Sequence, residues 1–327
     1  MRYIESDSKD PYFNLALEEY VFDRLPREES WFMLWQNANS IIIGKYQNAL
    51  EEINQQYVDA HGIRVARRLS GGGAVYHDTG NLNFTFIVDQ KNTSDFDFSV
   101  FVVPVVEALR KLGVEAEFGG RNDILIGGRK ISGNSQYVHR GRIMHHGCIM
   151  LESNLENVTD ALRVKPAKFQ SKNIQSVRSR VTTINENAPR PISMEEFKAA
   201  LRAQVLGDAG AVPYELTAED LTEIEKLRAE KYATWEWNYG RAKKFSMTRE
   251  EKFPAGLVTV QMEAENGHIR EIGISGDFFG NGDIRELEAG LAGAALDEHL
   301  EEKLEELGLG DYMSGITPAE LAGLIRG

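Results

Sequence analysis

Hydrophobic and polar positions follow a helical or a strand period over most of the chain. Between residues 82 and 88, large apolar residues alternate with Asn83 and Thr85, which predicts a strand with one buried face. Residues 98–112 keep one apolar side at helical spacing and stop before Gly113, which predicts a helix that ends at a glycine. Further helices are expected at 13–25, 51–60, 193–206, 218–233, 284–291, 295–307 and 318–325, and further strands at 31–35, 41–46, 114–118, 124–126, 143–151, 257–264 and 268–275.

The order of these elements favours an α+β fold. Strands dominate the centre of the chain and helices flank them, which is not the regular alternation of a parallel sheet. The texture changes after about residue 185, and the polar stretch 239–244 is typical of a linker. We therefore expect a large domain over residues 1–244 and a small α/β domain over residues 245–327.

Composition and charge narrow the classes of protein. The 327 residues contain 42% hydrophobic and 27% charged residues, values that argue against disorder. No apolar run is long enough to span a bilayer, and residues 1–7 lack the apolar stretch that is typical of a signal peptide. With 37 basic and 50 acidic residues the net charge is −13, which disfavours binding to nucleic acid or to an anionic membrane. The single cysteine, Cys148, excludes an intramolecular disulfide, so we expect a cytoplasmic protein.

Residues 67–78 include three successive glycines, Gly71 to Gly73, and two arginines, Arg67 and Arg68, shortly before them. Glycines allow the main chain to approach a ligand closely, and arginines pair with phosphate or carboxylate. The spacing matches neither a Walker A loop nor a dinucleotide-binding fingerprint. The composition fits a ligand-binding loop and a tight strand connection equally well.

Three other segments carry candidate chemistry. Lys130, flanked by glycines, fits either a phosphate contact or a basic β-turn, and taken alone the turn is favoured. His145 and His146 should point to opposite sides of a strand, and one cysteine is too few for a typical zinc site. Cys148 begins an apolar run, which predicts an inert buried thiol.

A local inversion of charge follows the strands. Between Ala161 and Asn185 there is no acidic residue, although six basic residues fall there. In an acidic chain this favours a segment that contacts a polyanionic ligand or an acidic partner over a solvated loop.

Taken together and in order, these segments resemble the lipoate–protein ligase A family of the biotin/lipoate ligase superfamily. The resemblance covers most of the chain, and its matching segments are 13–19, 43–48, 67–78, 80–81, 83–84, 122–123, 128–133, 145–147, 176–181 and 237–240.

The resemblance implies a mixed-sheet catalytic domain of the biotin/lipoate-ligase type with a small accessory domain. It implies an ATP-dependent ligase that converts free lipoate to lipoyl-AMP and passes the lipoyl group to a lysine of an acceptor. Mg²⁺ is expected with the nucleotide. The implied acceptors are apo lipoyl domains of 2-oxoacid dehydrogenase E2 subunits or glycine-cleavage H protein.

The resemblance also assigns residues. Lys130 is the expected catalytic residue, in contact with the lipoyl carbonyl and the α-phosphate. The expected ATP or adenylate contacts are Lys130, Arg68, Gly73, Ala74, Val75, Tyr76, Asn83 and Arg178. The expected lipoate contacts are Lys130, Gly71, Gly72, His146 and Leu17. Asp123 is the expected magnesium ligand. The basic stretch 165–180 would be the adenylate-binding loop. Arg140, Arg142 and the stretch 163–180 are the expected contacts of an acidic acceptor.

Two rival functions remain at this point. An ATP-independent octanoyl or lipoyl transferase of the same fold uses a cysteine that precedes the lysine motif, but residues 113–122 contain none. The second rival is a lipoate-binding protein without ligase activity. A biotin ligase is disfavoured because its glycine-rich loop differs from residues 68–73.

Overall fold

The computed structural model describes residues 1–327 except 91–96, 120–121, 163–179, 208–211 and 241–244. Its strands are β1 Arg2–Glu5, β2 Trp31–Trp35, β3 Ser40–Ile43, β4 Arg64–Arg67, β5 Val75–His77, β6 Asn81–Asp89, β7 Ala116–Gly119, β8 Asp123–Ile126, β9 Arg129–His139, β10 Arg142–Met150, β11 Val212–Pro213, β12 Met247–Phe253, β13 Gly256–Glu265 and β14 His268–Gly276. Its helices are α1 Pro11–Asp23, α2 Ala49–Glu52, α3 Gln55–Ala60, α4 Ser99–Lys111, α5 Leu155–Ala161, α7 Met194–Leu206, α8 Ala218–Leu227, the π-helical turn η2 Arg228–Tyr232, α9 Trp235–Tyr239, α10 Ile284–Leu291, α11 Leu300–Glu306, α12 Leu309–Tyr312 and α13 Pro318–Arg326.

A large mixed sheet forms the centre of the first part of the chain. Among the described residues its strand order is β11-β1-β2-β6-β10-β9-β8-β7. β1 runs parallel to β2 and β11, whereas the pairs from β2 to β7 are antiparallel. The expected α+β class with a mixed sheet is confirmed.

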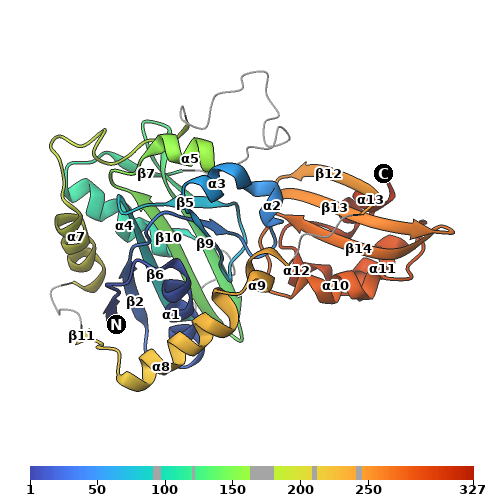
Figure 1. Cartoon of the computed structure of the whole chain (residues 1–327), viewed down its shortest axis with the longest axis horizontal. Helices are drawn as coiled ribbons and strands as arrows, with labels where there is room; N and C mark the ends of the chain where they lie inside the picture. Colours follow the sequence, from blue (N-terminus) through green and yellow to red (C-terminus); the bar gives the residue numbers. More distant parts are fainter. Residues whose placement is uncertain (91–96, 120–121, 163–179, 208–211, 241–244) are drawn as a thin grey trace.

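The two faces of this sheet are covered by different elements. Successive side chains of a strand alternate between faces. Phe32, Leu34 and Phe84 pack with α4 and α7 in one core, whereas Met33 and Trp35 pack with α1 in another. The small sheet β4-β3-β5 supplies Ile42 and Ala66 to this second core. Figure 1 shows α4 and α7 on the left and α1 with α8 below.

The last part of the chain folds around its own apolar core. Strands β12, β13 and β14 form an antiparallel sheet, and α10, α11 and α13 pack on it, as expected of a small α/β unit. Two aromatic residues cross between the units. Tyr46 stacks on Phe278 at 4.8 Å between ring centroids, and Phe279 packs beside Phe98 at 5.6 Å. The two cores therefore interlock beside the glycine-rich segment.

Several sequence-based boundaries were wrong. The helix expected at 51–60 is two helices, because Ile53 forms a β-bridge with Leu162 and the Asn54 side chain then caps α3. Lys130, for which a β-turn was favoured, lies in the long strand β9, which begins at Arg129 directly after the turn at residues 127–128. Its Ser, Gly and Asn residues have low strand propensity, and the strand forms because β9 pairs with β8 on one side and β10 on the other. No described helix is long and apolar enough to cross a membrane.

Candidate active site

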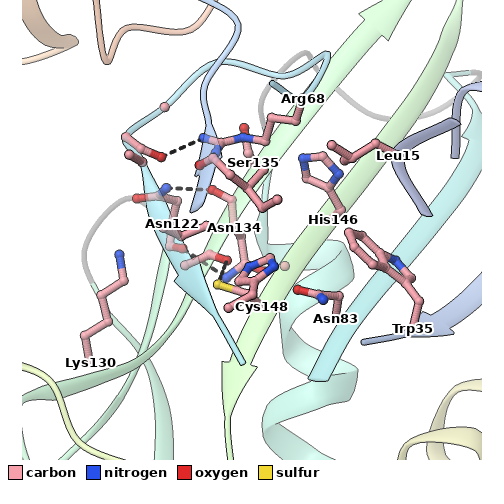
Figure 2. Close-up of a pocket in the computed structure, with 18 residues that line it drawn as sticks. Leu15, Trp35, Arg68, Asn83, Asn122, Lys130, Asn134, Ser135, His146 and Cys148 are labelled. Carbon is pink, nitrogen blue, oxygen red and sulfur yellow. Dashed lines mark hydrogen bonds between the residues drawn. The ribbon is translucent and has the colours of Figure 1, made fainter. Parts of the chain in front are cut away.

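One row of the large sheet forms the floor of a cavity of about 120 Å³. Trp35 of β2 lies opposite Asn83 of β6, Asn83 opposite Cys148 of β10, and Cys148 opposite Gly133 of β9. Directly opposed residues point to the same face of a sheet. Figure 2 shows Lys130 at one side of this cavity and Trp35 at the other, with Cys148 and Asn83 between them. The cavity therefore runs across the strands from a lysine to a tryptophan.

A second, larger cavity of about 520 Å³ adjoins the first. Most residues that border it are apolar, and Glu52, Asp123, Lys130 and Arg180 contribute charged side chains. The residues that border both cavities are Ala74, Val75, Lys130, Gly133 and Cys148. Lys130 is the one charged side chain among these shared residues of the described chain. The arrangement places a cation where the two cavities meet.

The position of Lys130 follows from its strand. Lys130 is the second residue of β9, and its Nζ lies 2.7 Å from Asp123 Oδ1 on the neighbouring strand β8. Gly133 leaves the space for this side chain, since a Cβ there would lie 3.0 Å from Lys130 Nζ. About one third of the Lys130 side chain stays exposed (36%), so the amine can contact a ligand in either cavity.

Arg68 holds the glycine-rich segment in place. Its side chain is buried, and its guanidinium donates to the carbonyls of Ile42 at 3.1 Å, Gly71 at 2.6 Å and Gly73 at 2.9 Å. Its Nε donates to Ser70 Oγ at 3.1 Å. Burial lowers the pKa of Arg68 to about 10, which still leaves it positive at neutral pH. The structure thus gives this arginine main-chain partners, although it also borders the smaller cavity.

A buried hydrogen-bond chain connects helix α1 with the glycine-rich segment. Glu18 lies 3.0 Å from His146 Nδ1, and His146 Nε2 lies 2.6 Å from Ser70 Oγ. Thr85 Oγ1 donates to Glu18 at 2.5 Å and accepts from the Trp35 indole at 2.9 Å. Each of these groups has a partner, so the chain fixes the side walls of the smaller cavity.

Most of the residues expected from the sequence meet at these two cavities. The smaller cavity is bordered by Arg68, Gly72, Gly73, Ala74, Val75, Asn83, Lys130 and His146. The larger cavity is bordered by Ala74, Val75, Tyr76, Asp123 and Lys130. Arg178 and most of the basic stretch lie outside the described residues, although Arg180 borders the larger cavity.

Three expected residues have a different position. Leu17 is fully buried and borders neither cavity, and Leu15 borders the smaller one instead. Residues two apart on a helix point to nearly opposite sides, which explains the exchange. Gly71 lies under Phe279 and also borders neither cavity. Asn83 lies beside Trp35 in the smaller cavity, whereas Asn81 borders the larger one.

Sequence reasoning missed several lining residues, namely Trp35, Ile42, His77, Asn122, Asn134 and Ser135. Trp35 and Ile42 were expected only as strand residues, because strand register decides which strand residues face the cavity. A usable signal existed for Glu18, which is a carboxylate on the apolar side of the predicted helix 13–25.

The expected role of Arg142 in contacting an acidic acceptor is wrong. Arg142 is buried and donates to the carbonyls of Val21 and Phe22, and also to those of Leu25 and Pro26 beyond the end of α1. It therefore satisfies the last carbonyls of that helix. Arg140, by contrast, lies exposed in the turn between β9 and β10.

Buried histidines should make the protein sensitive to acid. Burial, helped by the positive Arg68 and by His146, lowers the pKa of His77 to about 3, so folded His77 stays neutral. In the unfolded chain a histidine binds a proton below about pH 6.5, so stability falls as the pH drops from there towards 3. Between pH 8 and pH 5 we expect His77 to lower the free energy of unfolding by about 2 kcal/mol. Denaturant unfolding at both values measures this, and a His77→Phe variant with the same pH dependence as wild type would contradict it.

Comparisons with known proteins identify the family of this chain. Residues 10–206 match the family model of the lipoyl protein ligase A/B catalytic domain, and residues 242–325 match that of the bacterial lipoate protein ligase C-terminus. The chain is 49% identical to lipoate–protein ligase 1 of Staphylococcus aureus, with 99% of this chain and 100% of the relative covered. It is 44% identical to the lipoate-protein ligase LplJ of Bacillus subtilis, with 99% and 100% covered.

Solved structures show the same fold. Plasmodium falciparum LipL1 in complex with lipoate superposes with a TM-score of 0.78 at 25% identity and covers 99% of this chain and 98% of its own. A chain of a bi-partite lipoate protein ligase from Thermoplasma acidophilum, described with its E2 lipoyl domain, matches at 28% identity with a TM-score of 0.66. That match covers 75% of this chain and 98% of the archaeal one. The chain therefore belongs to the lipoyl protein ligase A/B family.

Proposed function

We propose that this protein is an ATP-dependent lipoate–protein ligase, which forms lipoyl-AMP and transfers the lipoyl group to a lysine of an acceptor lipoyl domain. The observation that carries the proposal is the position of Lys130 at the junction of the two cavities. Membership of the ligase family and full-length similarity to curated ligases support the same activity.

The two cavities suit the two substrates of the first step. Leu15, Trp35 and Ile42 give the smaller cavity apolar walls for an acyl chain. The larger cavity, with Tyr76, Asn81 and charged groups at its rim, suits a nucleotide. The carboxylate of lipoate would attack the α-phosphorus of ATP where the cavities meet, and pyrophosphate would leave.

In this step Lys130 would stabilise negative charge. An ammonium group at the junction contacts both the acyl carbonyl and the α-phosphate, and such fixed charges accelerate phosphoryl transfer. The main chain of residues 72–76 would approach the adenylate without bulky side chains at Gly72 and Gly73. In the second step an acceptor lysine amine attacks the acyl carbon of the mixed anhydride, an amide forms and AMP leaves.

Asp123 could supply only part of the ligands that a magnesium ion needs. Among the described residues no group of three histidine, cysteine or acidic side chains is placed to hold a metal ion. Magnesium commonly binds through one or two carboxylates together with substrate phosphates and water. Asp123 borders the larger cavity, so it would supply one carboxylate ligand. The nucleotide phosphates and water would supply the remaining ligands.

The proposal assigns residues 1–244 to a catalytic domain and residues 245–327 to an accessory domain. The accessory domain contacts the glycine-rich segment directly, since Gly72 N donates to the Phe278 carbonyl at 3.4 Å. The acceptors would be E2 lipoyl domains or glycine-cleavage H protein. The protein would act in the cytoplasm. The archaeal ligase described with its E2 lipoyl domain supports the class of acceptor.

Pyrophosphate release tests the proposed function. The purified protein should release pyrophosphate with ATP and lipoate together and should then attach the lipoyl group to an apo lipoyl domain. Acyl attachment from an acyl-protein donor without ATP would support a transferase instead. Adenylate formation without attachment to either class of acceptor would support a binding protein without ligase activity.

Replacement of Cys148 by serine separates the ligase from a cysteine-dependent transferase. Burial raises the pKa of the Cys148 thiol, so little thiolate forms at neutral pH although the residue borders both cavities. We expect Cys148→Ser to keep lipoate-dependent pyrophosphate release within about threefold of wild type, since serine differs little in volume and the thiol takes no part in the chemistry. Loss of acyl transfer in this variant would contradict the ligase mechanism.

A further inference from the structure

His145 is a fully buried polar side chain that borders neither cavity. It precedes His146 on β10, so the alternation of a strand turns it to the opposite face of the large sheet. On that face the rings around it, at 4.7 to 6.5 Å between centroids, are those of Phe84, Phe86, Phe98 and Phe101. A polar ring in an aromatic core is stable only when its nitrogens are hydrogen-bonded.

The partners of His145 define which ring nitrogen carries the proton. Burial, together with the neighbouring His146, holds the pKa of His145 well below its usual range, so the ring is neutral. The Gln136 Nε2 group donates to the Asp97 carbonyl at 2.7 Å and lies 3.1 Å from His145 Nδ1, so Nδ1 is an acceptor. The single ring proton is therefore on Nε2, which donates to Asn134 Oδ1 at 3.3 Å.

Asn134 connects His145 with the start of strand β8. Its Oδ1 faces the imidazole, and its Nδ2 donates to the Asn122 carbonyl at 3.0 Å. The Asn134 main-chain N–H donates to the same carbonyl at 2.9 Å, and Asn122 Nδ2 donates to the Asn134 carbonyl at 2.6 Å. Gly147 leaves room for the Asn134 amide, since a Cβ at residue 147 would lie 2.3 Å from Asn134 Oδ1. Figure 2 shows Asn122 beside Asn134, and their hydrogen bonds fix the position of Asn122.

The residue after Asn122 is Asp123, the carboxylate that contacts Lys130. Asn122 borders the smaller cavity and Asp123 borders the larger one. Asp123 pairs with Gly133 of β9, and the register of the two strands then shifts at an irregularity before Lys130. Such bulges re-aim side chains, and here Lys130 Nζ lies 2.7 Å from Asp123 Oδ1. The hydrogen bonds between Asn122 and Asn134 hold β8 beside this irregularity and so set where the Asp123 carboxylate meets the amine.

We infer that His145 is a positioning residue for the first step of the reaction. Through Asn134 it fixes the start of β8, and the start of β8 holds the Lys130 amine where the two cavities meet. The inference rests on the proposed function and names a further residue on which that step depends. His145 contacts no cavity, so its effect is entirely on geometry, and a displacement of about 1 Å at a reacting group can cost about a hundredfold in rate.

Replacement of His145 by phenylalanine removes its hydrogen bonds and suits the aromatic core. We expect kcat for pyrophosphate release at saturating ATP and lipoate to fall about tenfold, because the Asn134 amide loses its fixed orientation. The KM for lipoate should stay within about twofold of wild type, since the apolar walls of the smaller cavity are unchanged. His145→Gln should restore most of kcat, because a glutamine amide can donate to Asn134 Oδ1.

Phe101→Leu is the matched control for core packing. Phe101 stacks on His145 at 4.7 Å between centroids and belongs to the same core. Its side chain has no polar group, so Phe101→Leu should lower the unfolding midpoint and leave kcat close to wild type. An equal loss of kcat in Phe101→Leu and His145→Phe would show a general effect of the core and would overturn the inference.

A double-mutant cycle tests the connection between the two side chains. Asn134→Leu alone should lower kcat by about tenfold or more. Addition of His145→Phe to that variant should cause less than about twofold further loss, because His145 acts only through Asn134. Two losses that multiply in the double variant would mean that His145 acts by another route.

The outcomes separate the two levels of the argument. If wild type releases no pyrophosphate with ATP and lipoate, the proposed function itself fails. If wild type is active and His145→Phe has the same kcat, the proposed function holds and the positioning role is wrong. If His145→Phe does not fold, nitrogen-15 NMR of folded wild type decides. A proton on His145 Nε2 supports the connection to Asn134, and a proton on Nδ1 excludes it.

Discussion

Replacement of Lys130 by alanine should reduce lipoate-dependent pyrophosphate release by about two to three orders of magnitude, the effect of removing one donor that stabilises transition-state charge. The Lys130 amine is the cation that both cavities share, and under the proposed function the reacting carboxylate and α-phosphorus would meet beside it. The side chain is 36% exposed and contributes little to the core, so the variant should unfold at nearly the wild-type midpoint. Steady-state kinetics with ATP and lipoate measure the effect.

Arg129→Ala is the matched control for this variant. Arg129 is the neighbour of Lys130 on β9, is exposed, and donates to Asn187 at 3.1 Å. Alternation along the strand turns it away from the cavities. We expect pyrophosphate release close to wild type in Arg129→Ala. An equal loss in both variants would mean that positive charge on this strand, and not a specific amine, supports the reaction.

Gly71→Ala should disturb the contact between the two domains and weaken nucleotide binding. A Cβ at residue 71 would lie 2.4 Å from the Phe278 carbonyl oxygen and 3.2 Å from Phe279 Cα, which are main-chain atoms with little freedom to move. We expect a loss of about 1–3 kcal/mol in unfolding free energy, as for other overpacked positions. The KM for ATP should rise about tenfold if the displaced segment loses about 1.4 kcal/mol of binding.

Gly73→Ala in the same segment is the control for stability. No atom lies within 4 Å of a Cβ placed at residue 73, and its φ angle is not in the left-handed region. Its unfolding free energy should match that of wild type, although the methyl group faces the cavity and can affect ligand binding. A stability loss in Gly73→Ala as large as that in Gly71→Ala would contradict the packing argument.

Local patterns predicted the elements whose signal lies within a few residues. β2 and α10 have the predicted bounds, because each combines a continuous apolar pattern with a clear end. β9 was missed because its residues are polar and its strand conformation comes from pairing with β8 and β10. Pairing partners distant in sequence cannot be deduced from the period of a single segment.

The chemistry of the site was more predictable than its walls. Lys130 and the glycine-rich segment were identified from composition and from the family resemblance, and they lie together in the structure. Leu15, Trp35 and His77 were not identified, because helix rotation and strand register decide which apolar or aromatic side chain meets the cavity. The rotation of α1 about its axis, for example, turns Leu15 and not Leu17 towards the cavity. The contact between Gly71 and Phe278 joins residues of two domains, so no local pattern contains it.

A crystal structure with a non-hydrolysable lipoyl-adenylate analogue tests the central claim most directly. The account predicts that Lys130 Nζ leaves Asp123, from which it is now 2.7 Å, and lies within hydrogen-bond distance of both the acyl carbonyl and the phosphate mimic. The acyl chain should occupy the smaller cavity, with its ring beside Trp35. A structure in which the analogue binds but the Lys130 amine stays on Asp123, away from both groups, would contradict the account.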